Sequence, residues 1–274
     1  MADPRSTGAP VADSLLSVPP GPCVVPKSDA SAGEVPRVSV VIPTYQESES
    51  IEAVVAQVSA ALDRVTQGSF EVIVVDDDSP DGTWHVALGT VEHFPRVRVM
   101  RRTGDRGLST AVVRGWQVAR GEILGVIDGD LQHPPEVLAL LYKKIGEGFD
   151  LVVGSRHVAG GGVSDWRLTR RLLSRGAQAL GLLLLPRVLT RVSDPMSGCF
   201  MVRREAIENV PFSPVGYKIL IEVIGRGRVG SIGEIGYVFR ERSDGHSKVT
   251  LKVYVDYVRH LARLRVAALR QSRS

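Results

Sequence analysis

Short apolar runs alternate with amphipathic stretches from residue 38 onward. The runs are rich in Val and Ile and lack alternation: Val38–Ile42, Val72–Val75, Val97–Met100, Ile123–Ile127 and Leu151–Val153. Stretches with helical spacing separate or follow them, near 49–63, 82–92, 108–119 and 135–147. Strands that are apolar on both faces and alternate with helices indicate a parallel sheet covered on both sides. We therefore predict a single α/β domain over residues 37–250, with a mostly parallel twisted sheet and a further strand at 231–239.

The two ends of the chain differ in composition from its centre. Residues 1–36 hold seven of the sixteen prolines and few large apolar residues, which predicts a disordered N-terminal tail. Residues 240–274 carry nine Lys or Arg against three Asp or Glu, a net charge of +6, whereas the whole chain carries +4. Within this basic end, residues 251–274 are predicted to form an amphipathic helix and a tail. A basic end favours anionic partners, but only 5% of the residues are aromatic, which argues against nucleic acid.

Composition excludes several classes of protein. The chain is 43% hydrophobic and 23% charged, which is typical of a globular domain rather than a disordered or collagen-like chain. No apolar run approaches the roughly 18 residues of a membrane-spanning helix. Two cysteines, Cys23 and Cys199, cannot form a disulfide framework or a zinc site, so a reducing, cytoplasmic location is expected.

Polar residues follow the predicted strands, at the edge where open α/β sheets bind their ligands. The segments that follow the first, second, fourth and fifth runs are Pro43–Glu47, Asp76–Thr83, Asp128–Gln132 and Gly154–Arg156. Because the carboxyl ends of parallel strands share one edge, their carboxylates should gather there. They would repel one another unless a cation or a hydrogen-bond donor compensates.

Two acidic clusters are candidates for ligand binding. Asp128 and Asp130, with Gln132, have the pattern of a site that holds a divalent cation against a diphosphate. A solvated turn is the alternative for an isolated Asp-x-Asp, and the strand-end position favours the metal site. Three consecutive aspartates, 76–78, are energetically costly at a buried strand end unless a ligand such as a base or ribose donates a hydrogen bond to one of them. We select Asp77 as that acceptor. Turn and cap roles suffice for Ser79 and Asp81.

Several cations have no acidic partner nearby in the sequence: Arg156, Arg170, Arg242 and Lys248. The loop 242–248 combines two cations with small residues, which suits closure over phosphates. Residues 166–193 hold six arginines, no acid, and leucines at helical spacing, so this segment and the C-terminal helix are candidates for docking on anionic lipid. The alternatives are that both pack on the sheet or bind a separate membrane subunit.

Taken in order, seven segments resemble one family. They are Val-Ile-Pro-Thr-Tyr-x-Glu, Val-Asp-Asp-x-Ser-Pro-Asp-Gly-Thr, Asp-x-Asp-Leu-Gln, Gly-Ser-Arg, Arg-x-x-x-Ser-Arg, Asp-x-x-Ser-Gly and Arg-x-x-Gly-x-Ser-Lys. From about residue 38 to 250 the chain is similar to the dolichyl- or polyprenyl-phosphate mannosyltransferases of glycosyltransferase family 2. The resemblance implies a Rossmann-like glycosyltransferase-A fold, a nucleotide-sugar donor, Mg²⁺ or Mn²⁺, and a membrane-held polyprenyl phosphate acceptor.

The resemblance also assigns roles to individual positions. It implies donor contacts for Pro43, Tyr45, Glu47, Val75, Asp77 and Gly129, and metal ligands in Asp128, Asp130 and Gln132. It implies that Arg156, Arg170 and Ser174 act with Asp130 in catalysis by holding the acceptor phosphate or the transferred sugar. It places Arg242 and Lys248 on phosphates of the donor. The chain departs from the family pattern at Asp78, where Asn or Gly is common, and at Gly129, where Ala is usual.

The expected reaction is inverting transfer of a hexosyl group, with mannose from GDP-mannose as the first choice, to polyprenyl phosphate. An acceptor already ionised near pH 7 needs no general base, which agrees with the lack of a clear histidine base. The enzyme would act peripherally at the cytoplasmic face of the membrane. Three alternatives stay open: a UDP-glucose or other UDP-sugar transferase, a sugar nucleotidyltransferase, and a non-catalytic nucleotide-sugar-binding protein. The nucleotidyltransferase would need a Gly-rich, basic loop after the first strand, which is absent.

Overall fold

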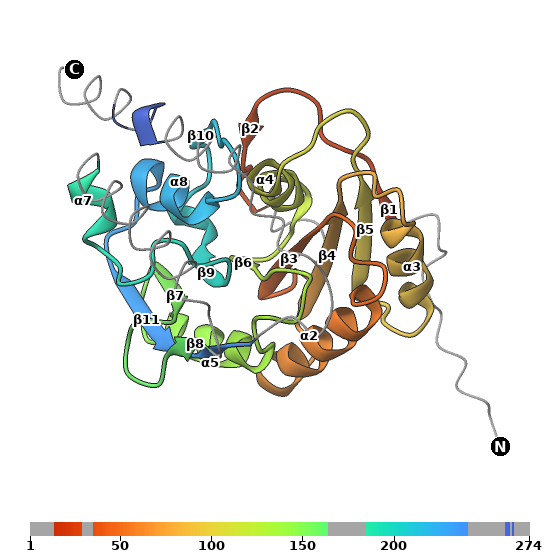
Figure 1. Ribbon diagram of the computed structural model, residues 1–274, viewed down its shortest axis with the longest axis horizontal. Coiled ribbons are helices and arrows are strands. Elements are labelled where there is room, and N and C mark those ends of the chain that lie inside the picture. Colours follow the sequence, from red (N-terminus) through yellow and green to blue (C-terminus); the bar gives the residue numbers. More distant parts are fainter. Residues whose placement is uncertain (1–13, 29–34, 164–184, 241–260, 264, 266–274) are drawn as a thin grey trace.

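A computed structural model of the chain places one central sheet between two layers of helices (Figure 1). The structure describes residues 14–28, 35–163, 185–240, 261–263 and 265. Eight strands form the sheet in the order β1-β5-β4-β3-β6-β9-β7-β11. Their bounds are β1 (Leu15–Leu16), β3 (Val38–Thr44), β4 (Phe70–Asp76), β5 (Val97–Arg101), β6 (Ile123–Val126), β7 (Leu151–Ser155), β9 (Phe200–Arg203) and β11 (Ile232–Gly236). All pairs are parallel except those of β9, which runs antiparallel to β6 and β7.

The helices cover both faces because the central strands are apolar on both faces. Helices α2 (Ile51–Thr66), α3 (Thr83–Gly89) and α5 (Glu136–Ile145) pack on one side, and α4 (Leu108–Val118) and α8 (Ile219–Arg226) on the other (Figure 1). Alternate residues of one strand feed opposite cores: Val41 faces α4, whereas Val40 and Ile42 face α2. The smaller elements are η1 (Thr90–Glu92), α7 (Pro186–Leu189), η2 (Arg204–Ala206), β2 (Cys23–Val24) paired with β10 (Pro211–Phe212), and β8 (Gly162–Val163) paired with β12 (Val238–Phe239).

The five predicted strands and four predicted helical regions are all present, and the strand expected at 231–239 is divided into β11 and β12. The sequence did not indicate β9 or α8. The antiparallel direction of β9 matters for function, because its N-terminal end pairs with the carboxyl ends of β6 and β7: Phe200 lies opposite Val126 and Val153. The segment 194–199, which enters β9, therefore reaches the ligand-binding edge of the sheet.

The prediction of a disordered tail over residues 1–36 is wrong for residues 14–28. Leu15–Leu16 adds a strand to the open edge of β5, Cys23–Val24 pairs with β10, and Val25 is fully buried. An edge strand offers unpaired backbone groups, so even a short apolar segment between prolines can pair with it. Residues 1–13 and 29–34 lie outside the described residues.

The predicted C-terminal helix is described only at 261–263 and 265. Leu261 is helical and fully buried against Leu185, Leu189 and Ile221, so this residue faces the protein. Most of the leucine-rich segment, at 166–184, lies outside the described residues. In the part of the chain that is described, no helix combines the length and hydropathy needed to cross a membrane.

Candidate active site

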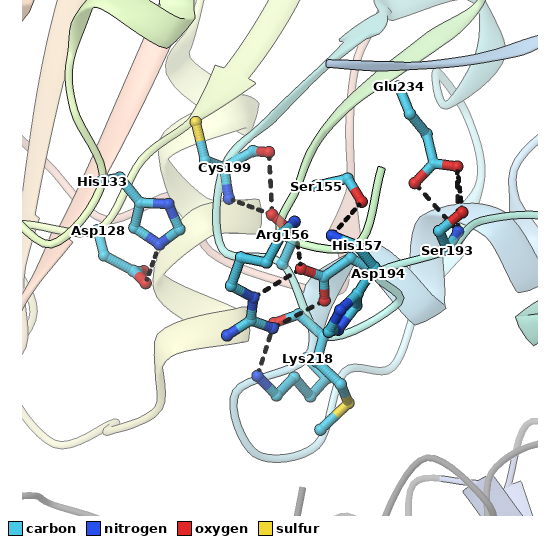
Figure 2. A network of polar contacts seen from close by, with 12 residues as sticks. Asp128, His133, Ser155, Arg156, His157, Ser193, Asp194, Cys199, Lys218 and Glu234 are labelled. Atoms are coloured by element: carbon cyan, nitrogen blue, oxygen red, sulfur yellow. Dashed lines mark hydrogen bonds and ion pairs between the residues drawn. The ribbon is translucent and has the colours of Figure 1, made fainter. Parts of the chain in front are cut away.

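The turn that enters β9 lies between two strand ends that carry predicted site residues. Asp128 follows β6, and Arg156 follows β7. The turn 194–199 contributes Asp194 to the Arg156 side (Figure 2). Its Gly198 lies against Asp128. A Cβ on Gly198 would collide with the carboxylate of Asp128, so only glycine lets the turn approach so closely. The two predicted halves of the site thus meet across one short segment.

The Asp-x-Asp loop is braced from several directions. His133 Nε2 lies 3.2 Å from Asp128 Oδ2, and the histidine ring packs against Tyr237 and Phe239 (Figure 2). Asp130 Oδ1 accepts a hydrogen bond of 3.1 Å from the backbone N–H of Gln132. Between them, Leu131 adopts a left-handed φ of 58°, a conformation that costs a non-glycine residue about 1–2 kcal/mol. Strain of this kind persists where surrounding contacts hold the backbone in one functional shape.

Gln132 links this loop to the end of β12. Its side-chain amide donates to the Arg240 carbonyl at 3.1 Å, and the Arg240 N–H donates to the Gln132 carbonyl at 2.9 Å. Gln132 was predicted as a metal ligand; its amide nitrogen bonds within the protein, and a ligand role for its side-chain oxygen stays a prediction. These two hydrogen bonds hold the acidic loop against Arg240, and the predicted phosphate-closing loop 242–248 lies outside the described residues.

The acidic loop fits a hard divalent cation in part. Asp128 and Asp130 provide two carboxylates on one tight turn, which is the usual protein share of a Mg²⁺ site completed by substrate phosphates and water. Among the described residues, no group of three or more His, Cys, Asp or Glu could hold a metal ion by itself. A cation bound here would therefore depend on oxygen ligands from the diphosphate.

Arg156 is neutralised by a carboxylate that the sequence analysis did not pair with it. Its guanidinium donates to both oxygens of Asp194, at 2.6 and 2.7 Å, and its backbone N–H adds a bond of 3.1 Å (Figure 2). The side chains are 10% and 1% exposed. Burial opposes charge in both groups, but their mutual contacts outweigh it: the pKa of Arg156 is raised and that of Asp194 is lowered. The partner is 38 residues away in sequence, so only the Asp-x-x-Ser-Gly segment hinted at it.

Lys218 lies beside these residues, and the sequence analysis did not single it out. It immediately precedes α8, its Nζ donates to the Met196 carbonyl at 2.8 Å, and it lies 4.3 Å from the centre of the Tyr217 ring. The pKa of Lys218 is lowered to about 8, mainly by burial and also by the charge of Arg156, while the charges of Asp128 and Asp194 oppose this. These influences place Lys218 in the same electrostatic cluster. The only sequence signal was a lysine directly before the apolar run 219–221.

The three consecutive aspartates are each satisfied within the protein. Asp76 accepts hydrogen bonds from the hydroxyl groups of Thr44, at 2.9 Å, and Ser79, at 2.6 Å. Asp77 accepts from buried Arg102 and from the Gly107 N–H, both at 2.6 Å, and Asp78 accepts from Arg101 at 2.7 Å. The argument that a ligand must compensate one of them was therefore wrong. A donor contact for Asp77 rests on the resemblance alone. As predicted for a turn, Asp81 accepts from Ser48 and Thr83.

The other predicted donor contacts lie along the same edge with different exposure. Pro43 and Val75 are paired across β3 and β4 and are buried, so their side chains belong to the core. Tyr45 accepts a hydrogen bond of 3.0 Å from Arg106, whose guanidinium carbon lies 4.8 Å from the centre of the Tyr45 ring. The backbone N–H of Glu47 is fixed by Thr83 at 3.0 Å.

Gly129 completes the described set. Its carbonyl accepts a hydrogen bond of 2.8 Å from the Ser50 hydroxyl. A Cβ added to Gly129 would lie 3.0 Å from a methyl group of Thr44. Arg170, Ser174, Arg242 and Lys248 lie outside the described residues. Cys199 is fully buried, as expected for a small packed residue, and burial raises the pKa of its thiol.

Comparisons with known proteins agree with this architecture. The sequence model of the family described as "Glycosyl transferase family 2" matches residues 39–210. A "Dolichol-phosphate mannosyltransferase" of Pyrococcus furiosus is 42% identical over 228 residues, covering 83% of this chain and 63% of that protein. A "Polyprenol monophosphomannose synthase" of Mycolicibacterium smegmatis is 36% identical over 78% of this chain and 81% of its own length.

The fold is also shared with solved structures. The mannosyl-3-phosphoglycerate synthase of Rubrobacter xylanophilus superposes with a TM-score of 0.63 at 24% identity, over 87% of this chain and 75% of that one. This likeness confirms the glycosyltransferase-A fold. Because the family model matches residues 39–210, more than half of the chain, and the mycobacterial relative is 36% identical with 81% of its length covered, this protein belongs to glycosyl transferase family 2 and is a glycosyltransferase.

Proposed function

We propose that the protein transfers a hexosyl group, most consistently mannose from GDP-mannose, to a polyprenyl phosphate with inversion at the anomeric carbon. The observation that carries the proposal is the turn 194–199, which lies between the acidic loop after β6 and the buried guanidinium of Arg156. A carboxylate pair for a cation, with a guanidinium held in one orientation beside it, suits a donor diphosphate and a second anion. The relatives named for transfer to dolichol or polyprenol phosphate support the choice of acceptor.

The proposed chemistry needs little from the protein beyond positioning and charge. An acceptor phosphate oxygen attacks C1 of the sugar, the bond from C1 to the diphosphate oxygen breaks, and the nucleoside diphosphate leaves with the electron pair. The acceptor is already ionised near neutral pH, so no side chain has to remove a proton. Arg156 would orient an anion, while the rigid Asp194 contact keeps its guanidinium in place.

Asp128 and Asp130 are the residues that would hold Mg²⁺ or Mn²⁺. When bound, such a cation offsets the negative charge that develops on the leaving diphosphate. His133 fixes one oxygen of Asp128, and the Gln132 N–H fixes one of Asp130, so both carboxylates are oriented beforehand. Glycosyltransferases of this fold have been crystallised with Mg²⁺ or Mn²⁺, which supports a divalent cation.

The acceptor would bring the protein to the cytoplasmic face of a membrane. The proposal also includes contacts to the donor from Asp77, Arg242 and Lys248. It includes contacts to the acceptor or the sugar from Arg170 and Ser174. Peripheral attachment through the basic C-terminal end, either to anionic lipid or to a membrane subunit, is part of it as well.

A donor panel tests the proposal directly. The full chain is incubated with polyprenyl phosphate vesicles, Mg²⁺ or Mn²⁺, and GDP-mannose, GDP-glucose or UDP-glucose, and both lipid-linked sugar and the nucleotide product are measured. We expect a nucleoside diphosphate rather than pyrophosphate, and mannose on the lipid. Release of pyrophosphate would instead indicate a nucleotidyltransferase, and binding without turnover a nucleotide-sugar-binding protein.

Asp130→Ala tests the role of the acidic loop. Loss of one preorganised charged group at a transfer site typically costs a factor of about 100–1,000 in rate. We expect such a loss, matched by chelation of the metal in the wild type. The control is Asp63→Asn, which removes an exposed carboxylate of α2. Wild-type turnover by a folded Asp130→Ala protein would refute the assignment.

A further inference from the structure

Lys218 carries a positive charge that the described protein does not neutralise. Asp194 accepts three hydrogen bonds from Arg156, and Asp128 contacts His133. In the described part of the chain, Lys218 forms no ion pair, and its ammonium donates to the Met196 carbonyl. An ammonium has three donors, so two are available in this position for another acceptor.

A purely structural tether is a weak explanation for this lysine. Holding one backbone carbonyl does not require charge, and Lys218 is half-buried, so its ammonium is partly withdrawn from water, which is unfavourable unless something pairs with it. The lowered pKa of Lys218, about 8, reflects that unfavourable burial. The protein retains a charged group here whose environment would be improved by an anion.

The surroundings specify which kind of anion fits. The Arg156–Asp194 pair is neutral as a unit, so the charge of Lys218 is in excess on that side of the turn, and the N-terminal end of α8 adds a partial positive charge. Figure 2 shows the Lys218 side chain extended toward the Arg156–Asp194 pair. Both substrates of the proposed reaction carry phosphate oxygens.

We infer that Lys218 is a further phosphate-binding residue, whose ammonium contacts a substrate phosphate oxygen on the Arg156 side of the turn 194–199. The inference rests on the proposed function for the identity of its two possible sources. One is the monophosphate of the polyprenyl acceptor, and the other is the diphosphate of the donor. Binding measurements separate these sources without any turnover.

The test uses the full chain with Lys218→Met, Lys218→Arg and the control Lys143→Met, an exposed lysine on α5. Calorimetry measures the binding of two probes, farnesyl phosphate without donor and GDP with Mg²⁺. Because a charged hydrogen bond contributes ~1.5–3 kcal/mol, we expect Lys218→Met to lower the affinity for one of the two probes by roughly ten- to a hundred-fold. Lys218→Arg should recover part of the loss, and Lys143→Met should bind both probes as the wild type does.

The outcome also identifies the source of the phosphate. If Lys218→Met binds farnesyl phosphate more weakly and GDP as before, Lys218 contacts the acceptor phosphate. If it binds GDP more weakly and farnesyl phosphate as before, Lys218 contacts the donor diphosphate. Unchanged binding of both probes overturns the inference, as does a loss for both that arginine does not rescue. If Lys218→Met weakens the binding of farnesyl phosphate, yet the wild type transfers no sugar to any polyprenyl phosphate, the proposed function fails and the assignment of Lys218 to a phosphate stands.

Titration provides a readout that a structural tether would not move. The charged groups that influence Lys218 are Arg156, Asp128 and Asp194. The folded-state pKa of Lys218 is about 8, so the ammonium is lost as pH rises through this value. Affinity of the wild type for its phosphate probe should therefore fall between pH 7.5 and 9.5, whereas that of Lys218→Arg should stay level. An identical fall in both proteins would contradict the inference.

Discussion

Replacing Asp194 with Asn isolates the buried ion pair on which Arg156 depends. The substitution keeps the shape of the side chain and one acceptor oxygen, but it presents an NH₂ group to a guanidinium that is 10% exposed. The pair has two charged hydrogen bonds, at 2.6 and 2.7 Å. Breaking a buried pair from one side costs about 3–5 kcal/mol, because the remaining charge stays buried.

The cost should be visible in thermal unfolding. At the lower limit of about 3 kcal/mol, a domain of this size loses roughly 6–12 °C in Tm. Sugar transfer should fall by about ten-fold or more even at temperatures where the variant is folded, because Arg156 is no longer held in one orientation. Differential scanning calorimetry and the transfer assay measure the two effects on the same preparation.

The stability that the Arg156–Asp194 pair contributes should depend on pH in a definite direction. Burial alone would raise the pKa of Asp194, but contacts with Arg156 hold it below the ordinary 3.8. The wild type therefore has the full contribution of the ionised pair above about pH 4 and loses it as pH falls through the lowered folded-state pKa. The difference in stability between wild type and Asp194→Asn should be constant near pH 7 and shrink in acid.

A matched control removes a carboxylate from the neighbouring strand. Glu234 accepts three hydrogen bonds from Ser193, next to Asp194, but the contact is exposed to solvent. We expect Glu234→Gln to cost under about 1 kcal/mol. If Asp194→Asn unfolds within 2 °C of the wild type and transfers sugar at the same rate, the account of the buried pair is wrong.

Two further substitutions separate the site from the scaffold. Gly198→Ala should reduce sugar transfer strongly with a modest loss of stability, because the added Cβ displaces the carboxylate of Asp128. The measurement is the metal concentration that gives the half-maximal rate, which should rise. An unchanged concentration would contradict the geometry. Glu71→Gln should do the opposite. Glu71 is fully buried between Arg98 and Arg120 at the far end of the strands, so chemical denaturation should show a loss of about 3 kcal/mol while the KM values stay the same.

The sequence determined the layered architecture and the parallel direction of its main strands. Runs such as Val72–Val75 are apolar on both faces, and a strand of that kind is stable only between two layers of helices. The same regularity placed Asp128 and Arg156 at one edge, because each follows a parallel strand directly. Local periodicity carries this information, so it can be read without any long-range contact.

Partnerships between distant residues were decided only by the tertiary structure. β9 is four residues long and antiparallel, and nothing in its local sequence specifies insertion between β6 and β7. That insertion brings Asp194 to Arg156 and Gly198 to Asp128, and it places the Met196 carbonyl within reach of Lys218. A cation in a sequence looks unpaired until the fold supplies its partner.

The aspartates after β4 illustrate the same limit from the opposite direction. Their sequence suggested excess charge that a ligand would have to compensate, but Arg101, Arg102 and the Gly107 N–H provide the donors from the next strand and loop. The sequence shows how many charged residues are close together in the chain, whereas the energy of a buried charge depends on hydrogen-bond donors within about 3 Å of it. Those distances exist only once the strands have packed side by side.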